Sequence, residues 1–149
     1  MKSLFNPRDR DALARRLAEL EPGAQRHWGR MEPAQMLAHC AIALGDVLGE
    51  RPVKQAFLGK LITPLIRGRI FGGKPFRRDA PTDPTYVVSN PQDFDAERSR
   101  LATLIDRVVQ RGTAKTEGMV HPFFGRLSGD QWGRLIHKHL DHHLRQFGV

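Results

Sequence analysis

The stretch His137-Lys-His-Leu-Asp-His-His-Leu-Arg-Gln146, near the end of the sequence, decides the fold. Four of the seven histidines of the chain lie within it. At about 100° per residue along an α-helix, His143 lies roughly 40° from His139, and Gln146 lies about 20° away on the other side. Two imidazoles at positions i and i+4 of one helix face can hold one metal ion. The stretch therefore predicts a helix with a candidate metal-binding face.

The residues around this pair define the helix further. Ser128-Gly-Asp-Gln131 is a capping-box pattern that predicts the helix start. By the same period, His137 points towards solvent, about 160° from His139, and His142 lies at the edge of the apolar stripe. Leu140 stands where a zinc-protease helix needs glutamate, which argues against that site. Two inward histidines can equally be core residues, so a metal site needs a third ligand from elsewhere.

His39 is the candidate for that third ligand. A helix is predicted from about Met31-Glu-Pro33 to Leu48, because proline is tolerated in the first turn. Gln35 and Asp46 lie within about 40° of His39, so this inward face is unusually polar. Buried polar groups need partners, and either a shared site or a simple pair of His39 with Asp46 supplies them. Cys40 is turned about 100° away and is interpreted as a small packed hydrophobe.

Two further helices carry cap signatures of the same kind. Asn6-Pro7 reads as an N-cap followed by the first helical position, and Asn90-Pro91 repeats it. Leucines at helical spacing follow the first signature until Pro22-Gly23, and apolar residues follow the second until Gly112. With the helices around His39 and His139, these make four principal helices.

The connections between these helices contain little regular structure in the sequence pattern. Residues 52–78 predict one helix broken near Thr63, and residues 80–90 predict an extended connection without a partner strand. Residues 113–127 predict a linker that contains glycines and a proline. The predicted fold class is all-α, a helical bundle with one or two long connections and an extra interrupted basic segment.

The composition is that of one soluble globular domain covering residues 1–149. No apolar run reaches the roughly 18 residues of a membrane span, and the start of the chain has no secretory pattern. The single cysteine, Cys40, excludes an internal disulfide and favours a reducing, cytoplasmic location.

The formal net charge of +8 comes from one local segment. Residues 51–78 contain eight basic side chains and no acid, and the rest of the chain is balanced. Such a patch can attract nucleic acid, an anionic lipid surface or an acidic small molecule. The absence of a nucleic-acid motif argues against the first partner, and an ordinary solvated face is the favoured interpretation.

Several motifs taken together resemble the DinB-like superfamily, and most closely one of its branches labelled only as a domain of unknown function. The resemblance covers nearly the whole chain. The residues that carry it are Trp28-Gly-Arg-Met31, Gln35-Met-Leu-Ala-His39, Lys74-Pro-Phe76, His121-Pro-Phe-Phe-Gly125 and His139-x-x-x-His143-x-x-Gln146.

The resemblance implies an antiparallel four-helix bundle that holds a divalent metal ion with three histidines. Carried over by position, the ligands are His39, His139 and His143, and Gln146 is expected to line the site or to support a ligand. Superfamily relatives include transferases that join a low-molecular-weight thiol to an electrophile, and a mycothiol-dependent isomerase. Family members are often dimers, so a homodimer is expected.

The proposed ligand set predicts a catalytic rather than a structural metal, because three imidazoles leave a coordination position for water or substrate. Zinc, nickel and iron all suit nitrogen ligands. The mechanistic hypothesis is metal-activated attack by a small-molecule thiolate, or hydrolysis by metal-bound hydroxide. The alternatives are a non-catalytic metal-binding or structural bundle, and polyanion binding through residues 51–78.

Four more residues are candidates near this site. His121 is expected to reach it from a loop or to anchor that loop, and His142 and Trp28 are expected to line it. Asp46 is expected to orient His39 or to pair with an arginine.

Overall fold

The computed structural model describes residues 1–55, 57, 59, 61, 63, 68, 70–80, 82–90 and 92–149. Within them the chain is mostly helical and has one small antiparallel hairpin, in which Val120 pairs with Arg126. The elements are α1 (Pro7–Glu19), α2 (Pro33–Leu48), the 3-10 turn η1 (Pro84–Tyr86), α4 (Phe94–Thr116), β1 (Val120–His121), β2 (Gly125–Arg126) and α5 (Gly129–Gln146).

The start signals of α1 and α5 are confirmed. The side chain of Asn6 accepts a hydrogen bond from the main-chain N–H of Asp9, and Pro7 is the first helical residue. At α5 both bonds of the capping box are present: Ser128 Oγ accepts from Gln131 N–H at 3.2 Å, and Gln131 Oε1 accepts from Ser128 N–H at 3.0 Å. These bonds satisfy helix N–H groups that lack a partner within the helix.

The bounds of α4 differ from the prediction at both ends. The N-cap is Asp93, whose carboxylate accepts from Ala96 N–H at 2.7 Å, and not Asn90; Pro91 lies outside the described residues. Gly112 interrupts the helix as expected, with φ of 71° and ψ of 172°, but helical turns resume and continue to Thr116. Aspartate caps as well as asparagine does, so the sequence offered two starting points.

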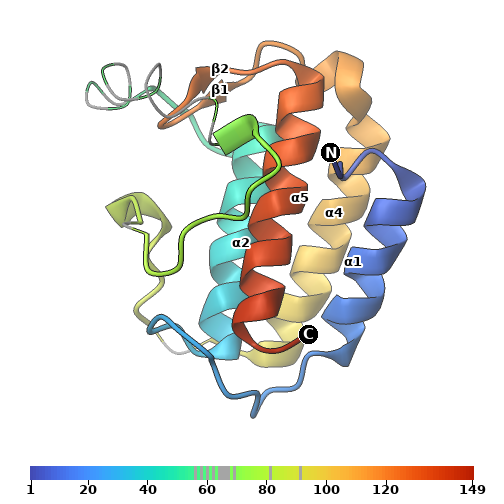
Figure 1. Cartoon of the computed structure of the whole chain (residues 1–149), viewed down its shortest axis with the longest axis vertical. Helices are drawn as coiled ribbons and strands as arrows, with labels where there is room; N and C mark the ends of the chain where they lie inside the picture. The colour runs from blue at the N-terminus through green and yellow to red at the C-terminus, as the bar shows by residue number, and fades with distance from the viewer. Residues whose placement is uncertain are drawn as a thin grey trace.

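Of these four helices, α1 and α5 run parallel to each other, and so do α2 and α4 (Figure 1). The first pair runs in the direction opposite to that of the second. Near the starts of α1 and α5, Leu4 N–H donates to the carbonyl of Gly133. Arg111, near the end of α4, donates to the carbonyl of Leu48 at the end of α2. Because α2 and α4 are parallel, the connection 49–93 must return along the length of the molecule.

All four helices contribute to one apolar core. Cys40 is fully buried there, and burial raises the pKa of its thiol, which confirms the interpretation of this residue as a packed hydrophobe. No helix of the described part of the chain is long and apolar enough to cross a membrane. The side chains that meet at the centre of the core are Leu13, Leu17, Met36, Cys40, Leu101, Ile105, Leu140 and Leu144.

His137 is buried, with 5% of its surface exposed, so the prediction that it points to solvent is wrong. Helical period describes one isolated helix, whereas α1 and the residues before it pack on this side of α5. The N–H of Leu4 bonds to Gly133 there, and the Arg16 guanidinium pairs with Asp141 at 2.7 Å. A second packing partner therefore covers a face that the sequence pattern assigned to water.

The long connection between α2 and α4 is described only in part. Of its predicted basic side chains, Lys60, Arg67 and Arg69 lie outside the described residues, as does most of the predicted helix break. Residues 80 and 82–90 are largely without regular structure, as expected, but contain the single turn η1, whose Asp83 side chain accepts from Thr85 N–H. This turn lies against α2 and brings Tyr86 to the site described next.

Candidate metal centre

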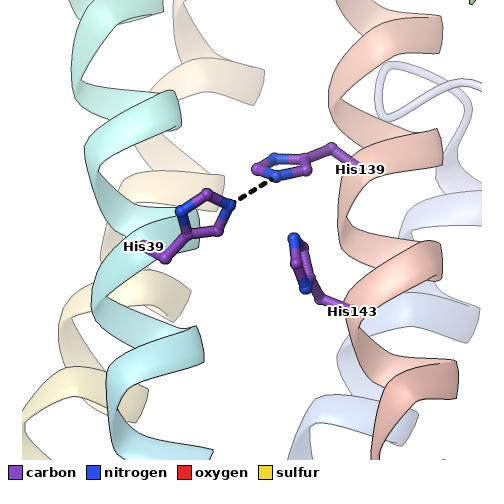
Figure 2. A group of neighbouring side chains, drawn as sticks. All are labelled: His39, His139 and His143. Carbon is purple, nitrogen blue, oxygen red and sulfur yellow. Dashed lines mark hydrogen bonds between the residues drawn. The ribbon is translucent and has the colours of Figure 1, made fainter. Parts of the chain in front are cut away.

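Three histidines from two helices meet inside the protein (Figure 2). His39 comes from α2, and His139 and His143 come from successive turns of α5. Their ligand nitrogens all lie within 4.8 Å of one another, and the Nε2 atoms of His39 and His139 are 2.9 Å apart. Metal–nitrogen bonds of about 2.0–2.1 Å in a tetrahedral site imply nitrogen separations of roughly 3.4 Å, which these values bracket. The donor set therefore fits one metal ion.

The three side chains are removed from solvent to different degrees. His39 and His143 are 5% and 7% exposed, and His139 is half-buried. The two α5 histidines face α2 because they are four residues apart and so share one helix face.

Burial keeps the three imidazoles neutral. It lowers the pKa of His39. It also lowers the pKa of His143, to about 3. The pKa of His139 lies well below its ordinary value through burial and, secondarily, through the neighbouring histidines. Neutral imidazole is the form that binds a metal ion, so the environment favours the ligating state near pH 7.

His39 is oriented by a main-chain carbonyl from the long connection. Its Nδ1–H donates to the carbonyl of Tyr86 at 2.9 Å, which directs Nε2 towards the other two histidines. Tyr86 is held in turn by its hydroxyl, which donates to the Asp46 carboxylate, and Asp46 also accepts two bonds from the guanidinium of Arg51. Asp46 thus meets an arginine, as expected, and supports His39 only through Tyr86; a direct pair of His39 with Asp46 is not formed.

His143 is oriented by a side chain of its own helix. Its Nδ1–H donates to Gln146 Oε1 at 2.9 Å, and Gln146 Nε2 donates to the carbonyl of Trp28 at 2.7 Å. Because a carbonyl only accepts, this contact fixes the amide and with it the proton on His143 Nδ1. Gly29, at φ of 77°, leaves room for the amide: a Cβ there would lie 2.4 Å from Gln146 Nε2. Such partners orient a ligating imidazole.

The remaining predicted site residues lie around the centre. His121 belongs to the hairpin, where its Nδ1 accepts from the N–H groups of Phe123 and Phe124 at 3.0 and 3.1 Å. This is the loop-anchoring arrangement, and burial lowers the pKa of His121 to about 4. The ring centroid of His142 is 5.1 Å from that of His143 and 5.5 Å from that of Trp28. His142 is therefore a neighbour of the histidine cluster, outside the group of potential ligands.

Tyr86 and Arg51 are the supporting residues that sequence reasoning missed. Tyr86 stood in a segment assigned to extended connection, and Arg51 stood in the basic segment. One signal was available: Tyr86 is the only tyrosine of the chain, and the buried Asp46 needed a donor. No local pattern, however, relates residue 86 to residue 39.

The fold and the site define a helical protein with a largely buried three-histidine cluster of the kind that can hold a metal ion. The chain belongs to the family described as "Protein of unknown function (DUF1569)", whose profile matches residues 5–148. Comparisons with curated proteins and with solved structures gave no match.

Proposed function

We propose that this protein is a metal-dependent enzyme of DinB-like type, an antiparallel four-helix bundle in which His39, His139 and His143 bind one divalent ion. The observation that carries the proposal is a pair of hydrogen bonds made by Nδ1 of His39 and Nδ1 of His143. These bonds turn Nε2 of both rings towards the same point. An ordinary core histidine needs one satisfied bond, whereas three converging imidazoles, two of them with the Nδ1 proton fixed by a partner, are typical of a ligand set.

The proposed reaction is transfer of a small-molecule thiol to an electrophile, with hydrolysis of a small substrate as the close variant. A divalent ion bound here would lower the pKa of a coordinated thiol or water and so supply the nucleophile. Tyr86 and Gln146 would hold the ligands still during the reaction. Cys40 is buried in the core, so it is not the nucleophile.

The competing function is a metal that only stabilises the helices. Structural zinc sites almost always use four protein ligands, whereas the cluster offers three among the residues that the structure describes, which favours the catalytic role.

The first test is elemental analysis of the purified, untagged protein beside two variants of α5. We expect about one equivalent of zinc, nickel or iron per chain, lost in His139→Ala and kept in His142→Ala, which removes the same residue type from the same helix. Circular dichroism checks that both variants are folded. Retention of metal by His139→Ala would remove the basis of the proposal, and a screen of thiols with electrophiles then tests the reaction.

A further inference from the structure

A cavity of about 170 Å³ lies beside the histidine cluster, on the side of α5 that carries His142. Its wall combines three parts of the chain: the linker before α2, the end of the basic segment, and α5 itself. The residues that matter for its chemistry are Trp28, Phe76, Arg78, Lys138, His142 and Arg145.

The cavity wall has an excess of positive charge. Arg78, Lys138 and Arg145 line it together with a single carboxylate, Asp141. That carboxylate is already shared, because it accepts from Arg145 at 2.9 Å and from Arg16 at 2.7 Å. Arg78 has no carboxylate partner within the described residues; its guanidinium lies over the Trp28 ring, 4.4 Å from the centroid. The site therefore attracts an anion.

The cavity also has an aromatic lining. The ring of His142 lies 5.5 Å from that of Trp28 and 6.0 Å from that of Phe76. The indole Nε1–H of Trp28 is buried and has no hydrogen-bond partner in the part of the chain that the structure describes. An apolar cavity of about 150 Å³ can hold benzene, so this volume suits one ring or a chain of similar size.

We propose that this cavity binds the anionic group, carboxylate or phosphate, of a small organic substrate, with Arg78 as its principal contact. The inference rests on the proposed function in one respect, that the substrate reacts at the neighbouring histidines. His142 and His143 are adjacent in sequence and their ring centroids are 5.1 Å apart, so a ligand beside His142 lies one side chain from the centre.

The test measures binding of four probes by tryptophan fluorescence at low salt: benzoate, phenyl phosphate, inorganic phosphate and neutral benzyl alcohol. We expect both aromatic anions to bind and to alter the emission of Trp28, with benzyl alcohol at least tenfold weaker. Trp28→Phe serves as the check on the origin of the signal. Loss of one charged hydrogen-bond donor weakens binding by about tenfold or more, which is the effect expected for Arg78→Ala.

Arg77→Ala is the matched control, because it removes the same charge from an exposed neighbour that does not line the cavity. Equal effects of Arg77→Ala and Arg78→Ala would overturn the inference, since attraction would then reflect net charge alone. Equal binding of benzyl alcohol, or no binding of either aromatic anion, would overturn it as well. Binding of inorganic phosphate as tight as that of phenyl phosphate would contradict the aromatic part.

Two further arms separate this inference from the proposed function. His139→Ala should bind phenyl phosphate within about twofold of the parent protein, because the cavity does not contain that residue. Failure of metal binding alone would thus leave the anion site standing. In Co²⁺-loaded protein, the ³¹P relaxation of phenyl phosphate should be enhanced, and Arg78→Ala should reduce the enhancement. A relaxation rate that Co²⁺ does not change would contradict the placement of the anion-binding cavity beside the metal centre.

Discussion

His39 and His143 are equivalent as ligands of the candidate centre but are held in different ways. His143 is oriented by Gln146, one turn further along the same helix. His39 is oriented by the carbonyl of Tyr86, which lies 47 positions away in sequence. The first arrangement is available as soon as α5 forms, whereas the second requires the turn η1 to pack against α2. The comparison shows that two ligands with the same role can depend on different supports, one local in sequence and one distant.

The largest effect should come from removing the ligands, and it should be the same at both positions. We expect His39→Ala and His143→Ala each to abolish metal binding at micromolar concentrations, because two imidazoles bind far more weakly than three. Metal content by elemental analysis and affinity by competition with a chromophoric chelator measure the effect. Strong binding in either variant would break the equivalence of the two ligands.

Acidification should act on both positions at once. The pKa of His143 is about 3 in the folded protein, below its ordinary value. As the pH falls, the unfolded chain therefore binds a proton at this residue near pH 6.5, whereas the folded chain binds it only near pH 3. The contribution of His143 to the stability of the metal-free protein is therefore fully present above pH 6.5 and is lost as the pH is lowered towards 3, by up to about 1.4 kcal/mol per pH unit. Urea denaturation from pH 7.5 to 4.5 measures the fall; constant stability would contradict it.

Loss of the local support should have the next largest effect. Gln146→Leu removes the acceptor of His143 Nδ1–H, and loss of such a partner typically costs about 10- to 100-fold in metal affinity. Gln146→Glu keeps an acceptor oxygen and should lose less. A Gln146→Leu variant with unchanged affinity would show that the amide serves only to pair with Trp28.

Weakening the distant support should have a smaller effect. Tyr86→Phe removes the hydroxyl that bonds to Asp46 but leaves the carbonyl that accepts from His39. A hydrogen bond to a charged group contributes about 1.5–3 kcal/mol to stability, and we expect a loss of that size. Because the carbonyl that orients His39 stays in place, the loss of metal affinity should be less than about tenfold. An effect larger than that of Gln146→Leu would reverse the ranking of the two supports.

The smallest effect on the centre should come from Cys40, next to His39 in sequence. Cys40→Ala should leave metal content and any thiol-transfer activity unchanged and lower stability by about 1 kcal/mol, because the thiol packs in the apolar core. Thermal unfolding and the chelator competition measure the two quantities. Loss of metal in this variant would contradict the placement of Cys40 in the core and would indicate that its sulfur is a metal ligand.

The local support could be predicted from the sequence and the distant one could not. Helical period brought His139, His143 and Gln146 to one face and turned His39 inward, because these relations depend on only a few residues of spacing. The role of Tyr86 depends on the packing of η1 against α2, a contact between distant residues that no periodic pattern in the sequence indicates.

Other parts of the chain show the same difference between features that depend on local spacing and features that depend on distant contacts. The burial of His137 depends on packing by α1, so a single-helix pattern assigned it to solvent. The hairpin of β1 and β2 was missed for a different reason, since strands of two residues are too short for alternation to register.

Gly29 has a consequence for any survey of tolerated substitutions in this chain. Its backbone disfavours L side chains, and a methyl group there would collide with the amide that holds His143. In a saturation library selected for metal retention, this position should favour glycine, although it offers no ligand and lies in an exposed linker. A glycine outside the cluster would thus register at about the level of Gln146, below the imidazoles themselves.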